Sequence, residues 1–159
     1  MTNAQHPSSV PGHGFFRDHT HILPARVYYE DTDFSGVVYH GAYVKFLERG
    51  RTEYLRAVGI HHKEMLELDE PIAFTIQKLE IDYKRPARID NALEIRTVFY
   101  QSKGARLRAD QSVWFEDQEL VAARVTAACI NLEGRVRRMP KFVADAVATQ
   151  VLPHDPVWA

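Results

Sequence analysis

The longest regular pattern in the chain is a stretch in which apolar residues return every three or four positions, which is typical of a helix with one buried face. It begins near Tyr39 and ends at Gly59, a residue type that often terminates helices. The apolar face consists of Tyr43, Phe46, Leu47, Gly50, Tyr54, Leu55 and Val58. Glycine in a helix costs about 0.5–1 kcal/mol relative to alanine, so we expect Gly50 to allow close approach to a sheet.

Most of the remaining apolar positions alternate with polar ones, as in antiparallel strands. A short strand is expected at 25–29, before the helix, and a longer one at 72–83, where the alternation slips near Lys78 and predicts a β-bulge. The turn at 102–104 predicts a hairpin between its flanking strands. The stretch 120–131 is apolar on nearly both faces, which favours a central strand. A short basic strand at 136–138 and helical residues up to about 148 complete the pattern.

One long helix followed by a run of strands predicts an α+β fold, in which a curled antiparallel sheet of about five strands wraps the helix. We expect a single domain at 22–148, because the chain of 159 residues is long enough for one core. Residues 1–21 are rich in Pro, Ser, Gly, Asn and His and predict a disordered leader, and 149–159 a flexible tail.

The charge balance excludes some classes of function. With 20 Lys and Arg against 21 Asp and Glu, the chain carries no field that would gather nucleic acid. No apolar run approaches the ~20 residues that span a bilayer, so no transmembrane segment is expected. The single cysteine, Cys129, cannot form an internal disulfide, and no secretory signal pattern is present. These features predict a protein of the cytoplasm.

A polar loop at 30–36, between the first expected strand and the long helix, holds the residues best suited to chemistry. Asp33 supplies a carboxylate, and Gly36 allows close backbone approach. The free N–H groups of the following helix amino terminus can hold the oxyanion that forms when a carbonyl is attacked. The loop therefore predicts a hydrolytic site.

The loop and helix also carry a family resemblance. The pattern is Tyr29-x-x-x-Asp33-x-x-Gly36-Val37-Val38-Tyr39-His40, continued by Tyr43, Phe46, Glu48 and Arg51-Thr52-Glu53, with weaker support from Tyr83-x-x-Pro86-Ala87-Arg88-x-Asp90 and Arg138-Met139-Pro140. It resembles the signature of the 4-hydroxybenzoyl-CoA thioesterase family of hotdog proteins. The match looks closest to the YbgC-type acyl-CoA thioesterases, the branch associated with the Tol–Pal system. The resemblance runs from about Arg26 to Val143.

The resemblance implies roles for particular residues. Asp33 matches the catalytic carboxylate, Tyr29 and His40 match other active-site residues, and the backbone N–H of His40, next to Tyr39, matches the group that polarises the carbonyl. Gly36 belongs to the structural part of the motif. Phe34 replaces a residue that is usually small, which would narrow the acyl pocket.

The implied reaction is hydrolysis of an acyl-CoA, with an aliphatic acyl group expected from the branch. A thiol with a pKa near 8.5 leaves as the thiolate with little proton donation, so one carboxylate and an oxyanion hole can suffice, without cofactor or metal. Asp33 could attack the carbonyl or deprotonate a water, and the sequence leaves both open.

Basic side chains on exposed, rigid elements are expected to meet the phosphates of coenzyme A. The candidates are Lys103 with Arg106 at the hairpin turn, and further Arg88 and Arg138. An uncovered sheet face and edge favour a homo-oligomer, either a dimer or a tetramer built as a dimer of dimers. Partners in an envelope system follow by analogy with the branch alone.

Three alternatives compete with the thioesterase hypothesis. The stretch 31–36 starts like an EF-hand loop, but its twelfth position is Ala42 instead of glutamate. A non-catalytic hotdog protein that binds an acyl-CoA or a protein is a second alternative, because a fold does not fix a function. A hotdog dehydratase is a third, although the chain lacks a His-Phe-Pro-like stretch.

Overall fold

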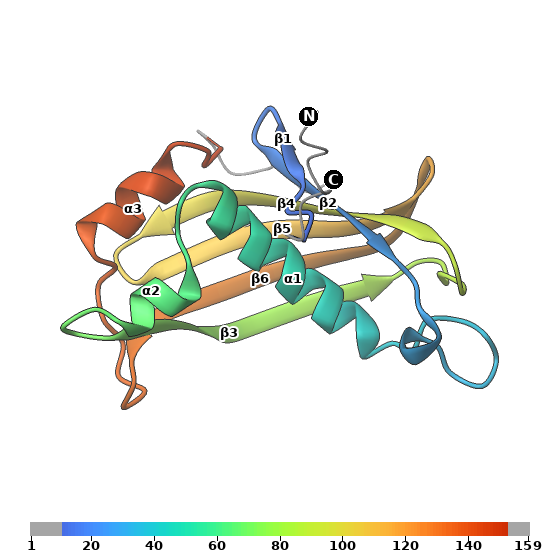
Figure 1. Cartoon of the computed structure of the whole chain (residues 1–159), viewed down its shortest axis with the longest axis horizontal. Helices are drawn as coiled ribbons and strands as arrows, with labels where there is room; N and C mark the ends of the chain where they lie inside the picture. Colours follow the sequence, from blue (N-terminus) through green and yellow to red (C-terminus); the bar gives the residue numbers. More distant parts are fainter. Residues whose placement is uncertain (1–10, 153–159) are drawn as a thin grey trace, which may run out of the picture.

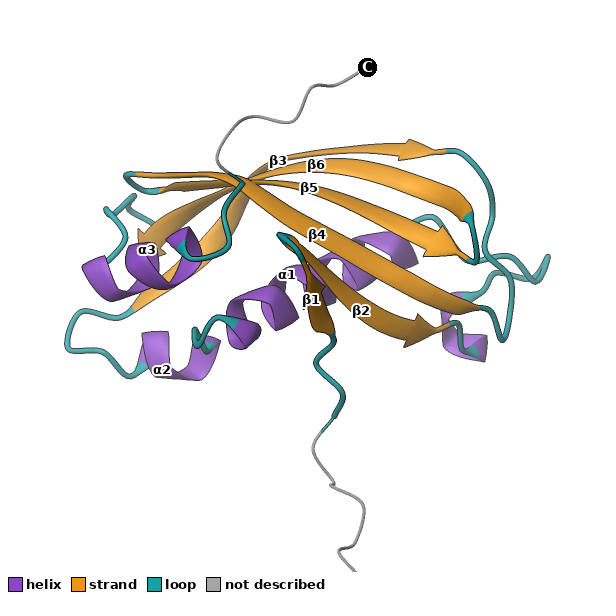
Figure 2. Cartoon of the chain, turned by 90° about the horizontal axis from the view of Figure 1, so that it is seen from above, coloured by secondary structure: helices purple, strands orange, loops and turns teal. Residues whose placement is uncertain are grey.

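A six-stranded antiparallel sheet curls around one long helix in the computed structural model, which describes residues 11–152 (Figures 1 and 2). The strands are β1 (Phe15–Arg17), β2 (Thr20–Arg26), β3 (Ile72–Tyr83), β4 (Ala92–Lys103), β5 (Arg106–Phe115) and β6 (Gln118–Asn131), in the sheet order β1-β2-β4-β5-β6-β3. The helices are α1 (Ala42–Ala57), α2 (His62–Leu66) and α3 (Lys141–Ala148). The expected α+β architecture is confirmed, with six strands where about five were predicted.

Helix α1 lies close against the sheet at Gly50. A Cβ atom on this glycine would come within 2.8 Å of Ile95 Cγ2 and 2.9 Å of Thr97 Oγ1, so the expected close approach is confirmed. The buried Gln111 amide ties the two layers together by donating to the Leu47 carbonyl at 2.8 Å and to Thr97 Oγ1 at 2.9 Å. The Gln111 amide nitrogen is thereby satisfied, as burial requires.

The strand pattern predicted between residues 72 and 131 is confirmed. The register between β3 and β6 shifts between Ile76 and Lys78, where the sequence predicted a bulge. Strands β4 and β5 form the predicted hairpin, and β6 lies between β5 and β3 as a central strand. The expected strand at 136–138 is reduced to one bridge, between Ile130 and Val136.

The amino-terminal part differs from the sequence prediction. Folded structure begins before Ile22, because β1 and β2 form a hairpin over residues 15–26, and the first strand ends at Arg26 instead of residue 29. His21 is fully buried there, and Phe16 packs edge-on against the rings of His21 and Tyr54. The polar composition of this segment hides the few residues that anchor it.

The first residues of the expected flexible tail, 149–152, belong to the described part of the chain. Helix α3 ends at Ala148, and the backbone N–H of Leu152 donates to the Phe99 carbonyl at 3.0 Å. Residues 1–10 of the expected leader and 153–159 of the expected tail lie outside the described residues. Over residues 11–152, no helix is long and apolar enough to cross a membrane.

Candidate active site

The loop that carries Asp33 is a tight turn in front of α1. A 3-10 turn (Tyr29–Asp31) leads into it, and an antiparallel bridge joins Thr32 to Val38. The Asp33 N–H donates to the Val37 carbonyl at 2.9 Å, and the Gly36 N–H donates to the Asp33 carbonyl at 3.1 Å. These bonds fix the Asp33 backbone, and so the direction in which its side chain leaves the turn.

Gly36 gives the loop its turn. Its φ of +82° lies in the left-handed region that favours glycine, and a Cβ atom there would meet nothing within 4 Å. The turn therefore requires glycine for its backbone conformation, and the space beside Gly36 is open.

The two carboxylates of the loop are used differently. Asp31 Oδ2 accepts the Tyr28 N–H at 2.8 Å, which shapes the start of the turn. Asp33 Oδ1 accepts both the Ser35 N–H, at 2.8 Å, and the Ser35 hydroxyl. The hydroxyl bond is the largest cause that lowers the pKa of Asp33 below its usual value. Asp33 is thus held as the ionised carboxylate, chiefly by the two Ser35 donors, with a smaller contribution from the Val37 backbone N–H.

The start of α1 lies directly after this loop. Helix α1 begins without a side-chain cap, and Ala42 and Val44 donate to the carbonyls of Tyr39 and Gly41. The N–H groups of His40 and Gly41 have no acceptor within the described part of the chain. Together with the partial positive charge of a helix amino terminus, these free donors can stabilise an oxyanion.

Segment 83–88 forms hydrogen bonds with both the loop and the start of the helix. The Val38 N–H donates to the Ala87 carbonyl at 2.8 Å, and the Ala87 N–H donates to the buried Tyr43 hydroxyl at 2.9 Å. The Tyr83 hydroxyl donates to the His40 carbonyl at 3.0 Å. A hollow of about 280 Å³ lies at this point, lined by Val38, His40, Tyr43, Tyr83, Lys84, Arg85 and Pro86.

Of the side chains predicted for catalysis, the structure places Tyr29 and His40 at the surface, in the segments before and after the Asp33 turn. Tyr29 is 87% exposed, and His40 is exposed with its ring 4.3 Å from that of Tyr39. Neither side chain hydrogen-bonds to Asp33 in this single chain. Phe34, next to the carboxylate, is fully exposed.

The predicted coenzyme A contacts fall into two groups. Arg88 bridges to Val37 and so lies beside the Asp33 loop. Lys103, Arg106 and Arg138 are exposed at the other end of β5, where the Met139 N–H donates to the Gly104 carbonyl. One chain therefore does not bring all four candidates together.

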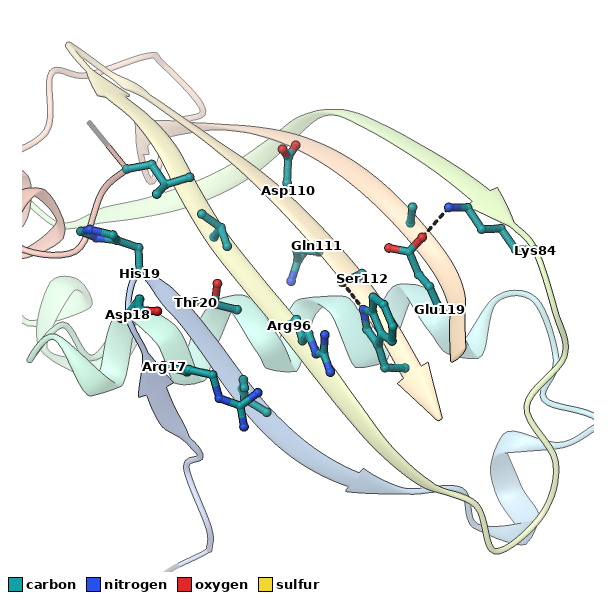
Figure 3. A pocket seen from close by; sticks show the side chains of 15 residues that line it. Arg17, Asp18, His19, Thr20, Lys84, Arg96, Asp110, Gln111, Ser112 and Glu119 are labelled. Atoms are coloured by element: carbon teal, nitrogen blue, oxygen red, sulfur yellow. Dashed lines mark hydrogen bonds and ion pairs between the residues drawn. The ribbon is translucent and has the colours of Figure 1, made fainter. Parts of the chain in front are cut away.

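A second hollow, of about 460 Å³, lies away from this site (Figure 3). Its lining includes Arg96, Asp110, Ser112 and Trp114, which alternate along β4 and β5 with residues that face α1. None of Tyr29, Asp33 and His40 lines it. The hollow is thus on the outer face of the sheet, separate from the Asp33 loop.

The sequence placed Tyr43 on the apolar face of the helix and in the family pattern, but it did not indicate the contacts of Tyr43, Tyr83 or Arg85 at this site. Tyr83 and Pro86 did appear in the weaker part of the family pattern, and that was the available signal. The contacts themselves join residues some 40 positions apart, which no local pattern reveals. For residues 11–152, no group of three His, Cys, Asp or Glu side chains is arranged to hold a metal ion.

A sheet curled around a central helix, with a carboxylate loop at the helix start, defines a hotdog-fold enzyme site. The family model described as the thioesterase superfamily matches residues 35–122, more than half of the chain, and the protein belongs to this family. The match begins two residues after Asp33. The enzyme class that follows is thioester hydrolase.

Two curated relatives are similar over most of their length. The chain is 41% identical over 115 residues to the acyl-CoA thioesterase YbgC of Haemophilus influenzae, covering 72% of this chain and 84% of the relative. It is 40% identical over 122 residues to the acyl-CoA thioester hydrolase YbgC of Escherichia coli, covering 76% and 90%.

Solved structures agree with the fold. A probable thioesterase from Bartonella henselae is 44% identical with a TM-score of 0.74, covering 76% of this chain and 99% of that one. A 1,4-dihydroxy-2-naphthoyl-CoA thioesterase from Synechocystis is 22% identical, also with a TM-score of 0.74, covering 81% and 96%. At that identity the second likeness shows the fold alone.

Proposed function

We propose that this protein hydrolyses the thioester of aliphatic acyl-CoA to a free acid and coenzyme A. The observation that carries the proposal is the ionised and partly exposed Asp33 carboxylate, fixed through Oδ1 by Ser35, directly before a helix start with unused N–H groups. The similarity to the YbgC acyl-CoA thioesterases supports acyl-CoA as the substrate.

In the proposed reaction the thioester carbonyl oxygen accepts hydrogen bonds from the N–H groups of His40 and Gly41. These bonds stabilise the negative charge that develops as the carbonyl carbon is attacked. The attacking group is either Asp33 Oδ2, giving a mixed anhydride that water then hydrolyses, or a water that Asp33 deprotonates. In both routes the carbon–sulfur bond breaks and coenzyme A leaves as a thiolate, which needs no acid of its own because its pKa is about 8.5. The exposed side chains of Tyr29 and His40 are proposed to contact the substrate.

The basic residues proposed to contact coenzyme A lie in two groups, one at each end of the sheet. Arg88, with Arg85 of the hollow beside His40, is proposed to meet the phosphates of coenzyme A, which lie at the far end of the pantetheine arm from the thioester. Lys103, Arg106 and Arg138 serve the same ligand only if a second copy of the chain presents them. A homo-oligomer in the cytoplasm that acts without cofactor or metal completes the proposal, and envelope-system partners remain an analogy with the family branch.

Thiol release from a panel of acyl-CoA esters, from acetyl to palmitoyl with one aromatic acyl, tests the function. Wild type is expected to release thiol, and Asp33→Asn to lose at least about a hundredfold, the scale of a lost acid-base group. Asp117→Asn, an exposed aspartate in the turn before β6, is the matched control and is expected to keep full activity.

Two results would contradict the proposal. A folded wild type that is inactive on every ester would favour a non-catalytic protein that binds acyl-CoA or another protein. An Asp33→Asn variant as active as wild type would remove Asp33 from the chemistry while leaving the enzyme class intact.

A further inference from the structure

The start of α1 has an unusual set of hydrogen bonds. Helix amino termini are commonly capped by a Ser, Thr, Asp or Asn side chain that accepts the free N–H groups. Here the residue before the helix is Gly41, and no side chain caps it. A capping side chain would occupy the same N–H groups that an oxyanion needs, so its absence keeps these donors available. Without the cap, the turn also lacks the hydrogen bond that usually stabilises a helix start.

Tyr83 supplies a contact on the other side of the same peptide. Its hydroxyl reaches from the end of β3 and donates to the His40 carbonyl at 3.0 Å. That carbonyl and the Gly41 N–H belong to one planar trans peptide, in which C=O and N–H point in opposite directions. A bond that holds the carbonyl therefore also fixes the direction of the Gly41 N–H, and polarises it as a donor.

The turn is packed from the other direction as well. The Tyr39 ring lies so close to Gly41 that a Cβ atom there would come within 2.7 Å of Tyr39 Cε1. The Tyr39 N–H donates to the Asp31 carbonyl at 2.9 Å, which ties the turn to the loop that carries Asp33. Tyr83 is thus the side chain that ties the His40–Gly41 peptide to the sheet.

We infer that Tyr83 is a positioning residue for the oxyanion hole, holding the His40–Gly41 peptide so that the Gly41 N–H faces the thioester carbonyl. This inference rests on the proposed function. The Tyr83 ring is half-exposed and packs edge-on against Tyr43 at 5.7 Å, so removing the hydroxyl leaves the ring packing in place.

The test compares Tyr83→Phe with a matched variant that removes the same atom elsewhere. Tyr54 is a fully buried residue of α1, and its hydroxyl has no hydrogen-bond partner in the described residues, so Tyr54→Phe breaks no bond. Tyr83→Phe is expected to lower kcat about three- to tenfold with KM unchanged, the effect of one neutral hydrogen bond. Tyr54→Phe is expected to keep wild-type kcat. Replacing Tyr83 by 4-aminophenylalanine, which restores a donor at the same place, is expected to recover kcat.

A spectroscopic measurement separates positioning from a structural effect. In the Asp33→Asn background, an acyl-CoA with a ¹³C-labelled carbonyl is bound and its carbonyl stretch is recorded by infrared difference spectroscopy. The stretch is expected to shift to lower frequency on binding, and Asp33→Asn/Tyr83→Phe is expected to lose part of that shift.

The outcomes are distinguishable from failure of the proposed function. If wild type and Asp33→Asn differ as expected but Tyr83→Phe keeps wild-type kcat, or the carbonyl frequency is the same with and without the Tyr83 hydroxyl, the positioning role is overturned alone. If wild type hydrolyses no acyl-CoA, the proposed function fails first.

Discussion

At the scale of single residues, the two aspartates of the loop, Asp31 and Asp33, have different surroundings. Asp31 accepts a backbone N–H and shapes the turn, whereas Asp33 is held by Ser35 through one oxygen. The sequence predicted Asp33 through its motif, because the motif fixes which aspartate precedes the helix. It could not predict Tyr83, since the bond to His40 depends on how β3 and the helix start meet in space.

Ser35 offers a test of how Asp33 is kept ionised. Its hydroxyl stabilises the carboxylate and is the largest cause of the lowered pKa of Asp33, so Ser35→Ala is expected to raise that pKa towards its usual value. The proposed reaction needs the carboxylate, so activity is lost as the pH falls through this pKa. The acid limb of kcat/KM is therefore expected to move to higher pH in Ser35→Ala, measured over about pH 3 to 7.

The same experiment contains its own control. Activity well above the pKa is expected to change little, because Asp33 is ionised in both proteins there. An acid limb that stays in place in Ser35→Ala would show that another group limits the reaction at low pH.

At the scale of elements, helix α1 and the sheet pack closely against each other. Gly50→Ala is expected to lower the free energy of unfolding by about 1–3 kcal/mol, because the added methyl group meets Ile95 and Thr97 at under 3.0 Å. This exceeds the roughly 0.5–1 kcal/mol that alanine gains in a helix. Thermal unfolding followed by circular dichroism measures the loss, with Lys45→Ala on the exposed face as control. A Gly50→Ala protein as stable as wild type would contradict this, because it would show that the sheet residues move to make room for the methyl group.

Elements with strong periodicity were predicted well, and those with little periodicity were not. The bulge near Lys78 followed from a slip in alternation, which is a local property of one strand. The β1–β2 hairpin was missed because its anchoring is not local. The ring of His21 donates from Nε2 to the His13 carbonyl at 2.8 Å and packs near Tyr54 of α1, and neither partner is adjacent to His21 in the sequence.

At the scale of the whole molecule, strand β3 is one of the two edge strands of the sheet. Its outer positions leave Ile76 43% exposed, and the loop beside its end exposes the ring of Phe34 completely. A long edge strand beside exposed apolar residues favours pairing with a second copy. Light scattering on a sizing column is therefore expected to give a mass of at least twice 18.3 kDa. A mass of one chain at micromolar concentration would contradict the homo-oligomer.

The opposite side edge is closed by β1, which is only three residues long and ends in a turn at Asp18, where φ is +53°. A sheet with one long edge and one blunted edge can join to a copy of itself once, by a two-fold axis, and then offers no further edge to a third chain. Among the described residues, the short β1–β2 hairpin thus favours an edge pairing that ends in a closed pair over one that extends into a fibre.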